Sequence, residues 1–210
     1  MSEPLLQAVN LQCERDDRML FRDLSFSILP GTLTRVEGPN GSGKTTLLRI
    51  LAGLNDAWSG QLLWLGKPRA RRREEFLHNM LYLGHRPGIK PLLTPVENLR
   101  ALMAGRKAMS DGVLLKALAG TGLAGFEDVP CRRLSAGQQR RVALARLLIA
   151  DEPLWILDEV FTAIDIDGVT ALEHLLVQRA RDGGAVVVTT HHDLQLPSMQ
   201  RICLGGADGL

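Results

Sequence analysis

A glycine-rich run early in the chain has the residue types needed to hold a phosphate group. It reads Gly38-Pro39-Asn40-Gly41-Ser42-Gly43-Lys44-Thr45, followed by Thr46, and fits the pattern G-x-x-x-x-G-K-[ST]. The glycines allow the backbone to curl so that several N–H groups face one anion. The Lys44 ammonium can reach the β- and γ-phosphates of a nucleotide, and the Thr45 hydroxyl can bind Mg²⁺. The run therefore predicts a nucleotide-binding loop.

Two adjacent carboxylates end an apolar stretch much later in the chain. Residues 154–157 are followed directly by Asp158 and Glu159. An acid at the end of a buried strand beside a phosphate loop can hold Mg²⁺, and a second acid can take a proton from an attacking water. We therefore expect Asp158 to serve the metal and Glu159 to act as general base. The Asp-Glu pair at 151–152 is rejected, because the apolar run before it belongs to the preceding helix.

Two further features could contact a nucleotide. Small residues and a hydroxyl in Leu134-Ser135-Ala136-Gly137-Gln138 stand just before a predicted helix, where they can form an anion site. Taken alone, this pattern indicates only a helix cap. The apolar run at 186–190 leads to His191, and an imidazole at such a strand end could bond a γ-phosphate and respond to its loss.

The segments that must position these groups alternate between strand-like and helix-like patterns, which is typical of an α/β fold with a largely parallel sheet. Strands are predicted at 5–11, 21–29, 32–37, 61–65, 80–83, 154–157 and 185–190. Helices are predicted from 44 to about 54 and at 69–78, 96–103, 113–121 and 138–149. The charged run at 67–75 is interpreted as a solvated helix face. We expect a single domain over 1–210, with a mostly helical insert at about 86–134.

Length and composition argue against several classes of protein. The 210 residues carry a net charge of +2 and are 45% hydrophobic, which are ordinary globular values. Such a small net charge gives no general case for nucleic-acid binding. The longest charge-free stretch, 24–34, is shorter than the ~20 residues of a membrane span, and no secretory signal is expected. Cys13, Cys131 and Cys203 fit no disulfide framework or metal spacing.

In their order and spacing, these motifs together resemble the ATP-binding cassette (ABC) ATPases over almost the whole chain. Residues 38–45 correspond to Walker A, Ser135 to Gln138 to the signature, and Asp158 with Glu159 to Walker B and its glutamate. Asp165 falls in the D-loop and His191 at the switch histidine. The resemblance implies a P-loop NTPase fold with a mixed sheet and a helical subdomain, and ATP and Mg²⁺ as cofactors. It also implies two copies head to tail, with each ATP between Walker A of one copy and the signature of the other.

Strings that the general family does not share resemble a narrower group. They are residues 13–16, 82–90, 122–128, 134–141, 155–159 and 161–165, and they are similar to the haem exporter ATP-binding proteins of bacterial cytochrome c maturation. This resemblance implies ATP-driven haem export, or release of a haem-loaded periplasmic chaperone. It further implies membrane-spanning transporter subunits and haem-handling membrane proteins as partners, and a peripheral location at the cytoplasmic face of the inner membrane.

Some positions depart from the general ABC pattern. His85 stands at the Q-loop position in place of glutamine and remains a candidate for contact with Mg²⁺, water or a membrane partner. Arg15 stands where an aromatic side chain usually stacks on adenine, and a guanidinium can also stack on a base. Ala136 replaces a glycine of the signature, and Val160 replaces a proline.

Two other interpretations stay open. One is a cassette ATPase for another exported or imported cargo. The other is a soluble cassette ATPase of DNA repair or translation, although these usually carry long coiled coils or two cassettes in one chain.

Overall fold

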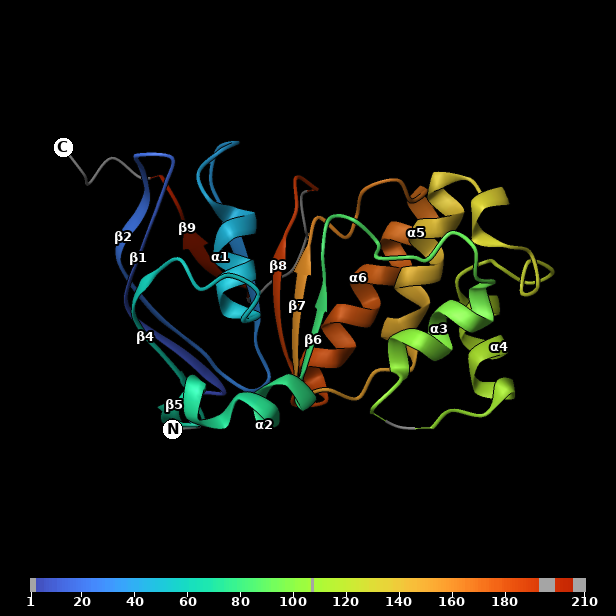
Figure 1. The fold of residues 1–210 in the computed structure, drawn as a ribbon, viewed down its shortest axis with the longest axis horizontal. Coiled ribbons are helices and arrows are strands. Elements are labelled where there is room, and N and C mark those ends of the chain that lie inside the picture. The colour runs from blue at the N-terminus through green and yellow to red at the C-terminus, as the bar shows by residue number, and fades with distance from the viewer. Residues whose placement is uncertain (1–2, 107, 193–198, 206–210) are drawn as a thin grey trace. The chain divides into compact units, whose positions relative to one another are not determined.

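A computed structural model describes residues 3–106, 108–192 and 199–205 (Figure 1). The chain forms two compact units. The first contains Met1–Tyr82, Glu152–Glu159 and Leu176–Leu210, and the second contains Leu83–Asp151 and Val160–Leu175. The segment at about 86–134, for which a helical insert is expected, lies within the second unit. Within the described ranges, none of the helices has the length and apolar character needed to cross a membrane.

A five-stranded sheet has the order β6-β7-β8-β3-β9. Its strands are β6 (Met80–Leu83), β7 (Leu154–Asp158), β8 (Ala185–Thr189), β3 (Leu33–Glu37) and β9 (Met199–Cys203). β7 pairs with β8, β8 with β3, and β3 with β9, all in parallel. Every residue of β7 and β8 is buried, as expected for strands covered on both faces. Because parallel strands end at one edge, the residues after β3, β7 and β8 meet there.

A second sheet, of four strands, has the order β2-β1-β4-β5. It contains β1 (Leu6–Arg15), β2 (Arg18–Ile28), β4 (Ser59–Trp64) and β5 (Lys67–Pro68), and all its pairs are antiparallel. Asp16 and Asp17 form the turn between β1 and β2 with φ of 53° and 58°, as a tight hairpin turn requires. The β1–β2 pair is antiparallel because so short a turn can join only antiparallel neighbours. Together with the parallel pairs of the five-stranded sheet, these strands give the mixed strand directions that the resemblance implies.

Helix α1 (Lys44–Leu51) packs against β7 and β8 and buries its leucine and isoleucine side chains in the core of the first unit. The charged run at 67–75 forms β5, the short helix η1 (Arg69–Arg72) and the start of α2 (Arg73–His78). Here the prediction of a solvated face is wrong for Arg69. Its Nη1 donates to the carbonyl oxygen of Ile50 at 2.8 Å, and its guanidinium lies 5.9 Å from the Trp58 ring centroid and 5.6 Å from that of Phe76. Burial lowers the pKa of Arg69 from its usual value.

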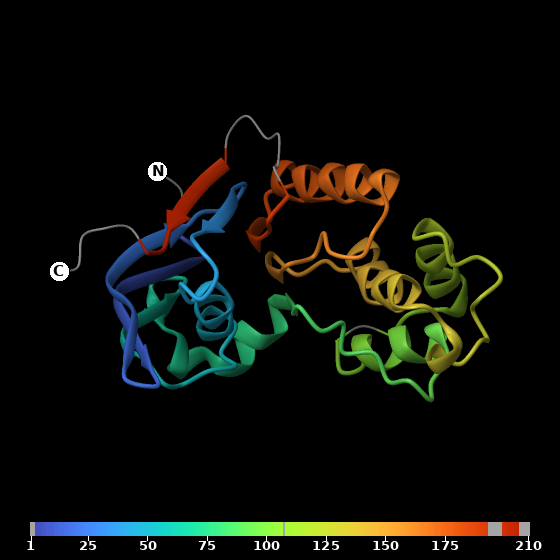
Figure 2. The same ribbon diagram turned by 90° about the horizontal axis from the view of Figure 1, so that it is seen from above.

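The second unit is mainly helical (Figure 2). Its elements are α3 (Pro95–Met103), α4 (Asp111–Gly120), η2 (Cys131–Arg133), α5 (Ala136–Ala145) and η3 (Arg146–Leu148). Leucines of α3 and α4 pack with Val142 of α5 in a core of their own. Helix α6 (Ile166–Arg181), the long orange helix in Figure 2, begins in this unit. Neither α6 nor β9 was expected from the sequence pattern.

Candidate functional site

The glycine-rich run joins the end of β3 to the start of α1, as the sequence predicts. Gly38 has φ of 148°, and a Cβ added there would lie 2.5 Å from the carbonyl oxygen of Leu204 and 2.6 Å from Ser42 Oγ. Gly43 caps α1 in the left-handed conformation, with φ of 96° and no side-chain cap, and α1 has no acidic residue in its first turn. The N–H groups at this helix start are therefore not satisfied by a capping side chain and are available to bind an anion.

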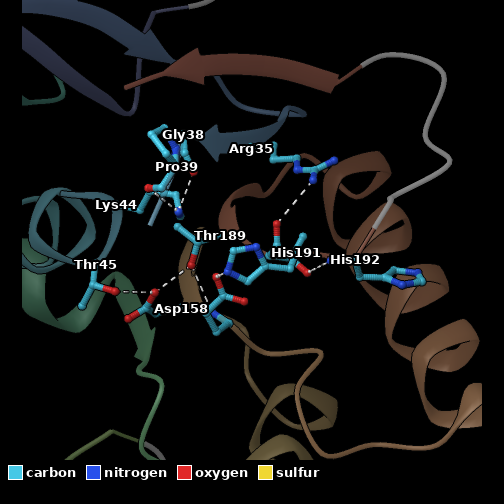
Figure 3. A network of polar contacts seen from close by, with 11 residues as sticks. Arg35, Gly38, Pro39, Lys44, Thr45, Asp158, Thr189, His191 and His192 are labelled. Atoms are coloured by element: carbon cyan, nitrogen blue, oxygen red, sulfur yellow. Dashed lines mark hydrogen bonds and ion pairs between the residues drawn. The ribbon is translucent and has the colours of Figure 1, made fainter. Parts of the chain in front are cut away.

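A cavity of about 490 Å³ lies beside this loop in the first unit. It is lined by Arg15, Asp16, Arg18, Leu20, Asn40, Gly41, Gly43, Lys44, Thr45, Thr46, Glu159 and His191. Most of the predicted nucleotide-binding residues of this unit thus surround one space, together with Arg15. Arg18, which no sequence motif indicates, lies opposite Arg15 in the strand register because of the tight β1–β2 turn. The Lys44 ammonium donates to the carbonyl oxygens of Gly38 and Pro39 at 2.7 and 3.1 Å (Figure 3).

Asp158, the last residue of β7, is only 1% exposed. Its Oδ1 accepts a hydrogen bond from the Thr45 hydroxyl at 3.2 Å and another from the Thr189 hydroxyl at 2.7 Å (Figure 3). Its Oδ2 is buried and has no hydrogen-bond partner among the described residues. Burial, with a smaller contribution from Asp158, raises the pKa of Tyr82 to about 12. The buried Asp158 carboxylate thus has one oxygen, Oδ2, that is available to a ligand.

Glu159 and His191 face each other across 3.6 Å between Oε1 and Nε2. Glu159 has φ of 51°, in the left-handed region, and the next residue, Val160, is fully buried. The neighbouring His192 is exposed and does not line the cavity, and its backbone N–H donates to Thr190 Oγ1 at 2.9 Å. Of the two adjacent histidines, the predicted one is at the site.

A second cavity of about 380 Å³ shares Lys44 and His191 with the first. Its wall includes Arg35, whose Nη2 donates to the carbonyl oxygen of Thr190 at 3.3 Å. Glu37 lies within 3.4 Å of Arg35 and 3.6 Å of Arg201. Sequence reasoning gave no signal for this ion cluster, because it depends on the pairing of β3 with β9.

The predicted signature lies in the second unit, at the start of α5. Ser135 is the N-cap: its Oγ accepts from the Gln138 N–H at 3.2 Å, and Gln138 Oε1 accepts from the Ser135 N–H at 2.9 Å. Ala136 has no positive φ, so its methyl group causes no backbone strain. A Cβ on Gly137 would lie 3.2 Å from the carbonyl oxygen of Ala163. The signature residues therefore form a capping box in addition to any contact with a nucleotide.

The remaining predicted positions also lie in the second unit. Asp165 precedes α6, and its Oδ1 accepts from the Gly168 N–H at 2.8 Å. His85 is exposed on the loop after β6. The carbonyl oxygens of Gly84 and His85 both accept from Nη1 of Arg140 at 3.1 Å, and Arg140 is 3% exposed. The helix that follows the signature thus holds the backbone at His85.

Residues 21–162 match the family model described as ABC transporter. The chain belongs to the ABC transporter family. It is 56% identical over 203 residues to the "Cytochrome c biogenesis ATP-binding export protein CcmA" of Hahella chejuensis, covering 96% of both chains. The protein of the same description from Vibrio cholerae is 50% identical over 204 residues, with 96% of this chain and 99% of the relative covered.

Solved ABC structures agree with this assignment. A dimeric ATP-binding cassette in a post-hydrolysis state, bound to ADP and Pi, is 25% identical, with a TM-score of 0.76 over 89% of this chain and 88% of the other. An ABC transporter ATP-binding protein from Pyrococcus furiosus has a TM-score of 0.80 at 22% identity, over 95% and 96% of the two chains. The expected fold, the ABC ATPase activity and ATP as the bound nucleotide are therefore confirmed.

Proposed function

We propose that this ABC ATPase drives a transporter of cytochrome c biogenesis, coupling ATP hydrolysis to haem export or to release of a haem-loaded periplasmic chaperone. The observation that carries the proposal is the identity of 50–56% to proteins named for cytochrome c biogenesis export, over nearly the full chain. The alternative is an ABC ATPase subunit for another exported or imported cargo.

In this proposal the nucleotide occupies the 490 Å³ cavity beside the glycine-rich loop. The N-terminus of α1 and the Lys44 ammonium bind its phosphates. Glu159 accepts a proton from the attacking water, and His191, 3.6 Å from it, contacts the γ-phosphate. A well-placed general base contributes a factor on the order of 10²–10⁴ to the rate. Arg15 and Arg18, at the cavity wall, offer guanidinium planes to the base.

The residues at the end of β7 fit Mg²⁺. The Thr45 hydroxyl and the carboxylate of Asp158 are hard oxygen ligands, and the buried Oδ2 of Asp158 has no partner within the described ranges. When bound, the ion neutralises charge on the β- and γ-phosphates. Asp158 and Thr45 hold their oxygens for it, and they do so from two elements, β7 and α1.

The signature suggests that two copies of the chain act together. In the proposed dimer, Ser135 to Gln138 of one copy contact the ATP bound by the other, and Asp165 lies near the shared interface. A dimeric cassette with ADP and Pi bound is among the similar structures, which supports this arrangement. Membrane-spanning subunits and haem-handling proteins complete the transporter, with this chain peripheral at the cytoplasmic face of the inner membrane. Arg140, on the helix that carries the signature, donates a hydrogen bond to the His85 carbonyl oxygen. Through this bond, a contact between the His85 loop and a membrane-spanning subunit can be linked to the signature helix.

A deletion experiment tests the proposed function. The gene is deleted in its host and restored as wild type, as Glu159→Gln, or as Glu74→Gln, a change at an exposed glutamate of α2 outside the site. We expect c-type cytochromes to be absent from the deletion strain and from Glu159→Gln while haem synthesis continues, and to return with wild type and Glu74→Gln. Normal c-type cytochromes in the deletion strain would rule out this function and favour another cargo.

A further inference from the structure

Thr189, the last residue of β8, is fully buried and lies opposite Asp158 in the register of β7 and β8. Its side-chain hydroxyl donates to Asp158 Oδ1 at 2.7 Å and accepts from the Glu159 N–H at 3.0 Å (Figure 3). A hydroxyl has one donor and two acceptor positions, so both bonds form together. One side chain thus contacts both neighbouring acids of the site.

The bond to Glu159 acts on an unusual backbone conformation. Glu159 has φ of 51°, which residues with a Cβ rarely adopt, and such conformations persist where the surroundings hold them. The Glu159 N–H lies 3.0 Å from the Thr189 hydroxyl and 3.1 Å from the Thr189 carbonyl oxygen. Thr189 therefore supplies two acceptors, its hydroxyl and its carbonyl oxygen, to the amide that fixes where the Glu159 side chain begins.

The hydrogen bond from Thr189 to Asp158 orients the carboxylate, because it engages Oδ1 and not Oδ2. With Oδ1 accepting from Thr189 and Thr45, the buried Oδ2 is the oxygen without a hydrogen bond to any described residue. A buried polar atom without a partner calls for an explanation, and a bound ion is one. Loss of the Thr189 hydroxyl would leave the carboxylate held by the longer Thr45 contact of 3.2 Å.

We propose that Thr189 is a positioning residue of the ATPase site, whose hydroxyl aligns the Asp158 carboxylate for the metal and the Glu159 backbone for proton transfer. The inference rests on the proposed roles of Asp158 and Glu159. A merely structural hydroxyl would affect folding and would weaken nucleotide binding equally with and without metal. A positioning hydroxyl acts specifically on the metal-dependent part of binding and on turnover.

The test compares Thr189→Val, which keeps the shape and removes the hydroxyl, with Thr189→Ser, which keeps the hydroxyl. Thr34→Val is the matched control, because Thr34 is also fully buried in this sheet and its hydroxyl bonds Gln200 at 3.2 Å, away from the two acids. The affinity of the purified full chain for a fluorescent ATP analogue is measured with Mg²⁺ and with a chelator. Steady-state kcat and KM for ATP are measured in parallel, and thermal unfolding reports folding.

We expect Thr189→Val to lower kcat by about ten- to a hundredfold, the effect of losing a hydrogen bond to a charged group. Most of the gain in affinity from Mg²⁺ should vanish, while the affinity in chelator stays within about twofold of wild type by the same reasoning. Thr189→Ser should restore both quantities, and Thr34→Val should change neither.

The inference is overturned if folded Thr189→Val keeps the wild-type kcat and metal dependence, or loses affinity equally in both conditions. It is also overturned if folded Thr189→Ser restores neither quantity. If the valine variant does not fold, Thr189→Ala is judged by the same measurements. Failure of the proposed function looks different: the wild type would show no metal-dependent ATP hydrolysis, or Glu159→Gln would retain it.

Discussion

The Nε2 atom of His191 lies 3.6 Å from the Oε1 atom of Glu159, and the two side chains differ in exposure, at 67% and 14% respectively. This separation is longer than a hydrogen bond. The pair joins a shielded carboxylate to an imidazole that solvent can reach. The Glu159 carboxylate is therefore the group of the pair that is shielded from bulk water, which suits its proposed role as general base.

The first prediction concerns that carboxylate. Replacing Glu159 by glutamine should keep ATP bound and lower hydrolysis by a factor on the order of 10²–10⁴, because the amide cannot accept the proton. Phosphate release and equilibrium ATP binding measure the two effects separately. Glu74→Gln, at an exposed position, is the control and should behave as wild type. A wild-type hydrolysis rate in Glu159→Gln would exclude the general-base role.

The second prediction separates steric conflict from backbone strain in the glycine-rich loop. A Cβ on Gly38 would lie 2.5 Å from the Leu204 carbonyl oxygen, whereas one on Gly88, with φ of 67°, would meet nothing within 4 Å. Gly38→Ala should therefore abolish ATP binding or cost about 1–3 kcal/mol of folding stability. Gly88→Ala should cost only the roughly 1 kcal/mol of a left-handed alanine. ATP binding and denaturant unfolding test both, and tight ATP binding with full stability in Gly38→Ala would contradict the structure.

The third prediction concerns Asn98, a buried amide in the second unit that is 1% exposed. Its Oδ1 accepts from the Lys90 N–H at 2.8 Å, and its Nδ2 donates to the carbonyl oxygens of Lys90 and Thr94 at 3.0 and 3.1 Å. Asn98→Ala should lower the free energy of unfolding by about 2–3 kcal/mol, because it removes several hydrogen bonds made by a buried side chain, including the one donated by the Lys90 N–H. Denaturant unfolding measures the loss. Asn55→Ala, which removes an exposed bond to the Ala57 N–H, should cost less than ~1 kcal/mol; an equal loss in both variants would refute the argument.

The fourth prediction is a pH dependence. Burial raises the pKa of Tyr82 from 10.0 to about 12, so the folded chain holds this proton more tightly than the unfolded chain. The associated stability is present below pH 10 and is lost as the pH rises through about 12. Tyr82 is the only tyrosine of the sequence, so its ionisation can be followed directly by ultraviolet absorbance. The midpoint should be near pH 12 when folded, and Tyr82→Phe should give no signal; a folded midpoint near 10 would disprove the shift.

The fifth prediction concerns the three thiols. Cys13 and Cys131 are buried, and burial raises the pKa of both, whereas Cys203 is exposed. Because the thiolate is the reactive form, one thiol per folded chain should react quickly with a disulfide reagent and two only on unfolding. Cys203→Ser should remove the fast phase. A fast phase of two thiols would show that a buried cysteine is accessible.

The phosphate loop and the paired acids could be predicted from the sequence because their chemistry depends on residue types close together in the chain. Thr189 could not, because its contact with Asp158 crosses 31 positions and depends on the register of β7 with β8. Arg18 was missed for a similar reason, since only the tight turn after β1 brings it to the cavity.

The elements that were missed or misjudged have weak local patterns. Helix α6 starts with Ile166, which is 83% exposed, and contains Gly168, so its first turn lacks a clear apolar face and strong helix propensity. β9 lies at the sheet edge and buries only Ile202. Arg69 was assigned to solvent by its charge, although its guanidinium lies over the Trp58 and Phe76 rings.

The position of β3 between β8 and β9 has a consequence for biosynthesis. β3 leads into the phosphate loop, and both strands that flank it lie far after it in the sequence. During synthesis on the ribosome, this strand must wait with both edges unpaired until residues 185–203 have emerged. The nucleotide cradle is thus completed only after β8 and β9 have emerged, and a chain truncated before β8 would expose a strand prone to aggregation.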